Sequence, residues 1–222
     1  MKEMQRGKRF FWAGMLLIIL FVLWTVLVQT VDVQNAGETG SRIGFATLNC
    51  WFHKITGVHM WLYSLTDWLG LVPVFICLLF GSIGFIQMIK RKSLLKVDLD
   101  LIFLGIYYVL VIVGYLVFEK IPVNYRPVLI EGRMEASYPS STTLLVLSVM
   151  PTLVFGMERR LKNANVKTMI HIVTLLFSVF MILGRLLSGV HWFSDIVGSV
   201  LLSVGLFYIY QAIVLLCDQE KS

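Results

Sequence analysis

The sequence has few charged residues and very few cysteines. Only 14% of its 222 residues are Asp, Glu, Lys or Arg, and 58% are hydrophobic. Soluble domains are typically about half apolar and about a quarter charged, so this composition argues against an ordinary soluble domain. The three cysteines, Cys50, Cys77 and Cys217, are scattered along the chain, and we expect no structural disulfide among them.

Metal-ligand motifs are missing as well. The sequence has no CxxC pair, no HExxH motif and no other spacing typical of metal ligands. We therefore expect neither a metal nor another cofactor. The sequence also has no internal repeat and no low-complexity tract.

Long apolar runs, in contrast, are abundant. Most approach the ~20 residues that a helix needs to cross the hydrocarbon core, although the fourth run is shorter. Because unpaired backbone groups are costly in lipid, these runs are expected to be helices. The sequence therefore predicts an all-α, polytopic membrane protein, a six-transmembrane-helix bundle that forms a single domain over residues 1–222. The six runs cover residues 10–28, 69–89, 99–118, 142–157, 168–187 and 193–216.

Two of these runs have particular features. The first follows a basic start, but it is longer than a usual signal-peptide core and is interpreted as a retained helix. The fourth contains Pro151, which is expected to kink the helix.

Basic residues gather on alternate connections between the runs. The net charge is +6, and the basic clusters precede the first run, separate the second from the third, and separate the fourth from the fifth. The positive-inside rule places these connections and both termini in the cytoplasm, and we expect a plasma-membrane protein. The clusters are thus interpreted as topology signals, and we expect no nucleic-acid partner. They are Lys2, Arg6, Lys8 and Arg9; Lys90, Arg91, Lys92 and Lys96; and Arg159, Arg160, Lys162 and Lys167.

The first connection on the other face, residues 31–68, is rich in Gly, Ser and Thr and then becomes aromatic. Aromatic side chains favour the membrane interface, so we expect an interfacial, partly helical lid. His53 and His59 are interpreted as polar residues at the headgroup level rather than as catalytic groups. The aromatic residues are Trp51, Phe52, Trp61, Tyr63 and Trp68.

Polar residues also stand at the ends of the later runs on this same face. Lys120 and Arg126 follow the third run, and an Arg fork and a Lys point charge both suit phosphate oxygens. Ser140, Ser141 and Thr142 begin the fourth run, where the free N–H groups of a helix N-terminus favour an anion. Taken alone, these groups also fit snorkelling cations and a helix cap.

A third group combines Arg185, His191 and Asp195. His191 and Asp195 are four residues apart, so they share a helix face if the helix begins near residue 192. A carboxylate beside an imidazole fixes its tautomer and leaves the other nitrogen free to attack. The alternative is a buried polar cluster, but ionisable groups at membrane depth are costly and usually functional. The three groups together predict phosphate chemistry at an extracytoplasmic site.

The three groups resemble the signature of the type 2 phosphatidic acid phosphatase superfamily of membrane lipid phosphatases. The family pattern reads Lys-x6-Arg-Pro, then Pro-Ser-Gly-His, then Ser-Arg-x5-His-x3-Asp. The chain reads Lys120-x5-Arg126-Pro127, then Pro139-Ser140-Ser141-Thr142, then Gly184-Arg185-x5-His191-x3-Asp195. The order of the motifs and the six-span layout also match.

The resemblance implies a role for each matching residue. His191 would be the nucleophile that forms a phosphohistidine, Asp195 would orient it, and Arg185 would stabilise charge in the transition state. Water would then release the phosphate, with no metal required. The phosphate-binding residues would be Lys120, Arg126, Ser140, Ser141 and Thr142.

The chain departs from the family pattern in three places. The first motif is one residue short, Gly184 replaces Ser, and Thr142 replaces the His that protonates the leaving group. Loss of a general acid typically costs about 10²–10⁴-fold in rate. A diphosphate substrate would need the acid less, because phosphate is a good leaving group. Candidate replacements on the same face are Glu119, Glu131, Glu135, His53 and His59.

Three functions remain open on the sequence. The first is a lipid phosphatase acting on phosphatidic acid, phosphatidylglycerol phosphate or a polyprenyl (di)phosphate. The second is a catalytically silent phospholipid-binding or regulatory protein, which Thr142 favours. The third is a small transporter, although the charges gather at one face rather than at the bilayer midplane. The lipid partner and the oligomeric state are left open.

Overall fold

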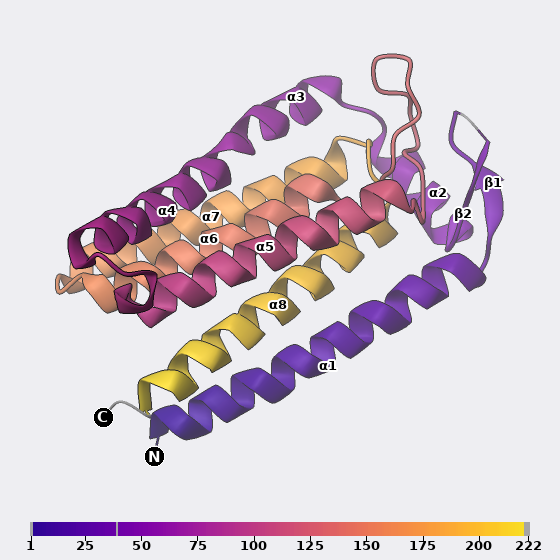
Figure 1. Cartoon of the computed structure of the whole chain (residues 1–222). Helices are drawn as coiled ribbons and strands as arrows, with labels where there is room; N and C mark the ends of the chain where they lie inside the picture. Colours follow the sequence, from indigo (N-terminus) through magenta and orange to yellow (C-terminus); the bar gives the residue numbers. More distant parts are fainter. Residues whose placement is uncertain (1, 39, 220–222) are drawn as a thin grey trace.

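The structure, a computed structural model, describes residues 2–38 and 40–219. These residues form a bundle of long helices with a small hairpin at one end (Figure 1). Six segments are long and apolar enough to cross a membrane, which confirms the predicted all-α, polytopic six-helix bundle. In chain order the elements are α1 (Lys2–Thr30), β1 (Gln34–Ala36), β2 (Ser41–Ile43), α2 (Ala46–Thr56), α3 (Met60–Leu69), α4 (Leu71–Arg91), the 3₁₀ turn η1 (Leu94–Lys96), α5 (Leu99–Lys120), α6 (Ser141–Arg160), α7 (Ala164–Leu187) and α8 (Phe193–Gln219).

The second span begins earlier than the sequence predicts. Gly70 joins α3 to α4 in a helical conformation (φ −59°, ψ −16°), so one apolar segment covers Met60–Arg91. Pro73 lies in the first turn of α4, where its missing N–H breaks no helical hydrogen bond. The prediction started at residue 69 because Thr66 and Asp67 lower the local hydropathy. The last part of the expected lid, residues 60–68, therefore extends the second span.

The rest of the first external segment is a short hairpin followed by a helix. β1 and β2 pair antiparallel, with Gln34 opposite Ile43. α2 then lies across the same end of the bundle as the hairpin (Figure 1). The segment is partly helical, as the sequence predicts, and it lies against the loops that carry the motifs.

α6 and α8 form the centre of the bundle. In their apolar stretches 56% and 50% of the residues are buried, against 17–28% in the other spans. α1 lies along α8 (Figure 1). The two helices approach closely at Gly14, where an added Cβ would lie 2.9 Å from the carbonyl oxygen of Gly205. Small residues allow such close approach between helices in membranes.

Two serines of α8 bind the beginning of α6. The hydroxyl of Ser199 donates to the carbonyl of Ser140 (3.0 Å), and that of Ser203 donates to the carbonyl of Leu144 (3.2 Å). Lipid tails are as apolar as the helix surfaces, so the hydrophobic effect does not bring helices together in a membrane. Packing and hydrogen bonds between the helices do so instead. These bonds set the position of the second motif relative to the third.

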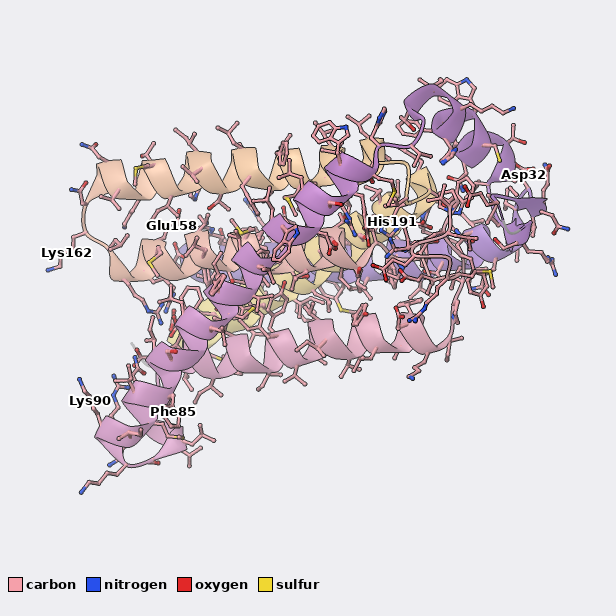
Figure 2. All side chains as sticks on the ribbon, turned by 90° about the horizontal axis from the view of Figure 1, so that it is seen from above. Asp32, Phe85, Lys90, Glu158, Lys162 and His191 are labelled. Carbon is pink, nitrogen blue, oxygen red and sulfur yellow. The ribbon has the colours of Figure 1, made fainter. Side chains whose placement is uncertain are left out.

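The basic turns and the polar motifs lie at opposite ends of the bundle. Figure 2 shows Lys90 and Lys162 at one end and His191 and Asp32 at the other. α1 begins and α8 ends at the basic end (Figure 1). There, Asp100 forms ion pairs with Arg159 (3.6 Å) and Arg160 (2.8 Å).

Candidate active site

The turn that carries His191 is fixed by contacts with the turn between α2 and α3. Gly189 has a positive φ (+72°), and a Cβ there would overlap the carbonyl oxygen of Gly57. The N–H of His59 donates to the carbonyl of Ser188 (2.9 Å), and Nε2 of His53 lies 3.1 Å from the carbonyl of Gly189. His53, through its side chain, and His59, through its backbone N–H, therefore contact the backbone of the turn that carries His191.

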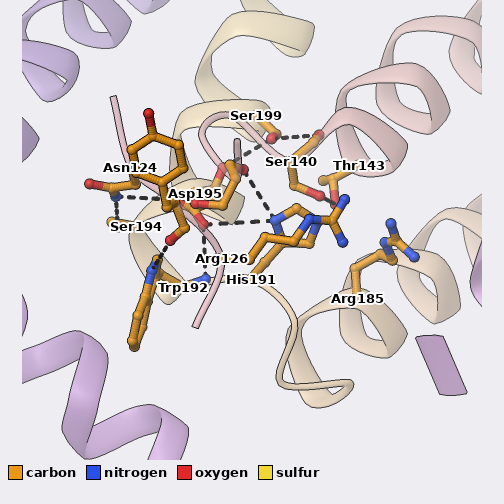
Figure 3. Close-up of polar contacts among 12 residues, drawn as sticks. Asn124, Arg126, Ser140, Thr143, Arg185, His191, Trp192, Ser194, Asp195 and Ser199 are labelled. Carbon is orange, nitrogen blue, oxygen red and sulfur yellow. Dashed lines mark hydrogen bonds and ion pairs between the residues drawn. The ribbon is translucent and has the colours of Figure 1, made fainter. Parts of the chain in front are cut away.

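The His191 imidazole is held by Nδ1. This nitrogen lies 3.1 Å from the carbonyl oxygen of Ser137 and 3.7 Å from Oδ2 of Asp195 (Figure 3). A backbone carbonyl can only accept, so Nδ1 carries the proton and Nε2 carries the lone pair. Nε2 is buried and has no hydrogen-bond partner in the described part of the chain. A lone pair that no hydrogen bond occupies is the arrangement that a nucleophile requires.

Asp195 is fixed by its own contacts. Its Oδ2 accepts from the N–H of Trp192 (2.9 Å), and the side-chain amide of Asn124 donates to Oδ1 (3.1 Å). Helix α8 begins at Phe193, so His191 precedes the helix and the carboxylate caps its first turn. Asp195 and the Ser137 carbonyl thus orient the imidazole together.

Electrostatics keep His191 neutral. Burial, followed by the positive charges of Arg126 and Arg185, holds the pKa of His191 well below its usual range. Loss of hydration disfavours the imidazolium, and the two guanidinium groups repel it. The unprotonated Nε2 is therefore the dominant form at neutral pH.

Arg126 and Arg185 bring buried positive charge to this site with several N–H groups unused. The Nη2 of Arg126 pairs with Glu135 (3.1 Å), while its Nε and Nη1 have no partner among the described residues. Arg185 contacts the carbonyl of Tyr63 (3.4 Å) through Nη1, and its Nε is likewise unpartnered. Both guanidinium groups lie over the Tyr63 ring, at 5.6 and 4.7 Å from its centroid.

Unused N–H groups on buried cations are costly unless a ligand completes them. Figure 3 shows Arg126, Arg185 and His191 together at this end of the bundle. The arrangement suits an anion with several acceptor oxygens, because an Arg fork matches phosphate geometry.

The second motif forms the N-terminus of α6. Ser140 is fully buried, and its hydroxyl donates to Oγ1 of Thr143 (3.0 Å). Ser141 is the first residue of the helix and Thr142 is largely buried. The side chain of Ser140 is therefore occupied within the helix, whereas the helix N-terminus itself remains directed at the site end.

The first motif is placed differently from the prediction. Arg126 reaches the site, but Lys120 is exposed at the last position of α5. Its neighbour Glu119 lines a cavity of about 230 Å³ together with Arg126, Glu135 and Ser141. The first motif is one residue shorter than the family pattern, and successive helix residues point about 100° apart. The acidic Glu119, and not the basic Lys120, therefore faces the cavity. The structure does not place Lys120 among the residues that line this cavity.

A second cavity of about 270 Å³ adjoins the first. Tyr115 and Ser141 line both of them, and Thr142 and Asp67 line only the second. Most of its other lining residues are apolar. Tyr115 and Ser141 therefore lie between the two cavities, and Thr142 faces only the mainly apolar one.

Sequence reasoning missed several supporting residues. Tyr63 was interpreted only as an interfacial aromatic, and Asn124 and Ser137 were not singled out. Asn124 stands inside the first motif, and its polarity next to a span was the available signal. Ser137 acts through its backbone carbonyl, which leaves no trace in the side-chain pattern.

The fold and this cluster define a polytopic membrane protein with a buried Arg–His–Asp site. A family model described as the PAP2 superfamily matches residues 74–217, which contain all three motifs. The chain belongs to the PAP2 superfamily. This confirms the resemblance seen in the sequence.

A solved structure shares the fold over nearly its full length. It is described as the first transmembrane PAP2 type phosphatidylglycerolphosphate phosphatase from Bacillus subtilis. The match has a TM-score of 0.66 and 17% sequence identity, and it covers 94% of this chain and 97% of that chain. At this identity the likeness shows a common fold. No curated protein matches the chain.

Proposed function

We propose that this PAP2-superfamily membrane phosphatase hydrolyses a lipid phosphate at the extracytoplasmic face through a phosphohistidine on His191. One observation carries the proposal: Nε2 of His191 and N–H groups of Arg126 and Arg185 are buried without hydrogen-bond partners among the residues that the structure describes. A bound phosphate would supply acceptors for the arginines and an electrophile for the imidazole.

The first step is attack on phosphorus. Nε2 of His191 forms the N–P bond as the bond from phosphorus to the leaving oxygen breaks, and that oxygen receives a proton. Asp195 and the Ser137 carbonyl hold Nδ1, which stabilises the charge that develops on the ring. Arg126 and Arg185 neutralise the oxygens of the phosphoryl group. Phosphoryl transfer depends mainly on such positioning and charge stabilisation.

The second step returns the enzyme to its starting state. The oxygen of a water molecule attacks phosphorus, the N–P bond breaks, and its electron pair returns to Nε2. The attacking water gives a proton to the group that protonated the leaving oxygen, and inorganic phosphate leaves. Because two arginines supply the positive charge, we expect this reaction to proceed in the presence of a chelator.

The substrate class follows from the place of the site. The site lies at one end of the spans, next to a mainly apolar cavity between α4, α5 and α6, so its substrate is expected to carry an acyl or prenyl chain. Phosphatidylglycerol phosphate is one candidate, because the matched Bacillus subtilis structure is described by that substrate. Phosphatidic acid and a polyprenyl diphosphate are the others. The basic turns at the opposite end support an extracytoplasmic site in the plasma membrane, with both termini in the cytoplasm.

A catalytically silent lipid-binding protein is the second candidate. Thr142 favours it, because threonine cannot serve as the proton donor that the family's histidine provides. The neutral, oriented His191 opposes it, since binding alone does not require a nucleophile.

Phosphate release by the purified protein in detergent and chelator tests the two proposals. The substrates are phosphatidic acid, phosphatidylglycerol phosphate and undecaprenyl diphosphate, with His191→Ala and Thr142→His as variants. We expect release by the wild type, loss of release in His191→Ala, and faster release in Thr142→His. No release by the wild type, with activity appearing only in Thr142→His, would instead support the silent lipid-binding protein.

A further inference from the structure

The reaction needs a proton donor that Thr142 cannot provide. The structure separates the candidates on this face by their contacts. Nε2 of His53 lies 3.1 Å from the carbonyl of Gly189, and Nε2 of His59 lies 2.9 Å from the carbonyl of Thr56. Glu131 lies in a turn, with a positive φ of 51°, and does not line the cavity next to Arg126. These three residues are engaged with the backbone or lie outside that cavity.

Two carboxylates line the cavity next to the site. Glu135 is bound to Nη2 of Arg126 (3.1 Å), so it neutralises and positions that guanidinium. Glu119 lines the same cavity from the last turn of α5 and forms no ion pair with any residue that the structure describes. Glu119 is thus the carboxyl group at this cavity that no cation of the described residues neutralises.

The cavity shares Arg126 and Ser141 with the proposed phosphate site, whereas His191 and Arg185 do not line it. Arg126 lines it and is 8% exposed, and its Nε and Nη1 have no partner in the described residues. Ser141, at the N-terminus of α6, lines it as well. A cavity of about 230 Å³ has room for a phosphate group and water, because one water occupies roughly 30 Å³ of liquid. A phosphate bound by Arg126 would therefore share this cavity with Glu119.

The position of Glu119 agrees with its contacts. It lies seven residues before Arg126, the place where the family pattern Lys-x6-Arg-Pro has its lysine. The chain thus has an acid on the helix face where that pattern has a cation. The chain also has Thr142 where the family pattern has its acidic histidine. Glu119 in place of the lysine thus adds a carboxyl group, and Thr142 in place of the histidine removes a proton donor.

We propose that Glu119 is the catalytic proton donor to the leaving group, in place of the missing histidine. As the N–P bond forms at His191, the leaving oxygen takes the proton of the Glu119 carboxyl group. In the second step the resulting carboxylate accepts a proton from the attacking water, which restores the acid.

Asp67 is the alternative carboxylate. It lines the second cavity with Thr142, but its Oδ1 lies 3.7 Å from Nη1 of Arg185. Exposure does not separate the two residues, because Glu119 and Asp67 are both exposed. Its charge is thus directed at an arginine, as that of Glu135 is. Glu119 is the cavity carboxylate without such a partner.

The inference rests on the proposed phosphatase activity, and leaving-group dependence tests it separately. A proton donor matters for a poor leaving group, such as an alkoxide, and little for a good one, such as p-nitrophenolate. The experiment compares release from phosphatidic acid and p-nitrophenyl phosphate by the wild type, Glu119→Gln, Glu135→Gln and Asp67→Asn. Glu131→Gln, in the exposed turn, is the matched control and should behave as the wild type.

We expect Glu119→Gln to lose about 100-fold or more on phosphatidic acid and less than about threefold on p-nitrophenyl phosphate. Activity on the aryl substrate also shows that the variant is folded. Glu135→Gln should affect both substrates alike, because it acts through Arg126. Adding Thr142→His to Glu119→Gln should restore phosphatidic acid hydrolysis.

Equal losses on both substrates in Glu119→Gln, or no loss on either, would overturn the role of Glu119. A loss confined to phosphatidic acid in Asp67→Asn would transfer the role to Asp67. A wild type inactive on both substrates would refute the phosphatase activity itself, which a failure of Glu119 alone does not.

Discussion

At the residue scale, the candidate active site is characterised by side-chain nitrogen atoms that have no hydrogen-bond partner among the described residues. Nε2 of His191, two nitrogens of Arg126 and one of Arg185 are buried and unpartnered within the described residues. Folding leaves such groups unsatisfied at a cost of roughly 1–3 kcal/mol for each neutral one. A ligand would satisfy these atoms, and their number around His191 supports the proposed phosphate site.

The depressed pKa of His191 predicts a pH dependence of stability. Burial and the charges of Arg126 and Arg185 keep the folded-state pKa well below its usual range, whereas the unfolded chain binds the proton near pH ~6.5. Because the unfolded state binds more protons below that pH, the free energy of unfolding should decrease as pH falls below about 6.5. Thermal unfolding of the wild type and His191→Asn in detergent, from about pH 8 to about pH 5, measures the effect.

The wild type should lose more thermal stability than His191→Asn over this range. An identical pH dependence in the two proteins would contradict the neutral, buried state of His191. The test needs no substrate, so it is independent of the proposed activity.

Turns determine the geometry of the site at the scale of elements. The α7–α8 turn carries His191 and lies against the α2–α3 turn at Gly189 and Gly57. The segment 121–140 carries Arg126, Ser137 and the second motif, and it is held to α8 through Asn124. Helix α6 then begins where Ser199 and Ser203 bind its first turn.

Substitution of Gly189 should disturb the site more than an equivalent change elsewhere. Gly189→Ala requires a left-handed alanine, which costs about 1–2 kcal/mol, and also displaces the Gly57 carbonyl. Gly132→Ala is the matched control, because Gly132 has nearly the same φ (+73°) with nothing within 4 Å of an added Cβ. We expect Gly189→Ala to lower both Tm and phosphate release, and Gly132→Ala to lower Tm slightly with release unchanged. Equal effects of the two changes would contradict the packing argument.

Much of the element pattern follows from the sequence. Apolar runs predicted the spans because hydropathy determines which segments enter lipid. The start of the second span at Met60 was missed, since a polar turn of helix is tolerated when it lies among protein groups. The sequence interpretation named Glu119 only as one of five candidate acids, because it attributed the shorter first motif to loop length. On a helix, a shift of one residue instead turns a different side chain towards the cavity, which Glu119 lines.

The two ends of the whole molecule differ in charge and in chemistry. Basic turns and ion pairs such as Asp100–Arg160 occupy one end, and the His191 site occupies the other (Figure 2). The charge bias was visible in the sequence because it depends on residue counts in loops. The convergence of Tyr63, Arg126 and Arg185 was not, since it depends on how distant segments pack.

Because the basic turns and the His191 site lie at opposite ends of the bundle, we expect them on opposite sides of the membrane, with the site outside the cytoplasm. In a variant without its native cysteines, Glu131→Cys should react with a membrane-impermeant maleimide on intact cells. Lys162→Cys, at the opposite end, should react only after permeabilisation. Labelling of Lys162→Cys on intact cells, with Glu131→Cys protected, would reverse the proposed orientation.

The region matched by the family model begins at residue 74, but Tyr63 lies outside it and contacts both arginines. Asn49 also precedes that region; it binds Ser194, whose neighbour is Asp195. The first seventy residues are therefore a scaffold for chemistry encoded elsewhere in the chain. We expect substitutions in these residues to change substrate affinity and reaction rate while every motif residue stays the same. Substrate specificity can therefore differ between family members at positions outside the three motifs.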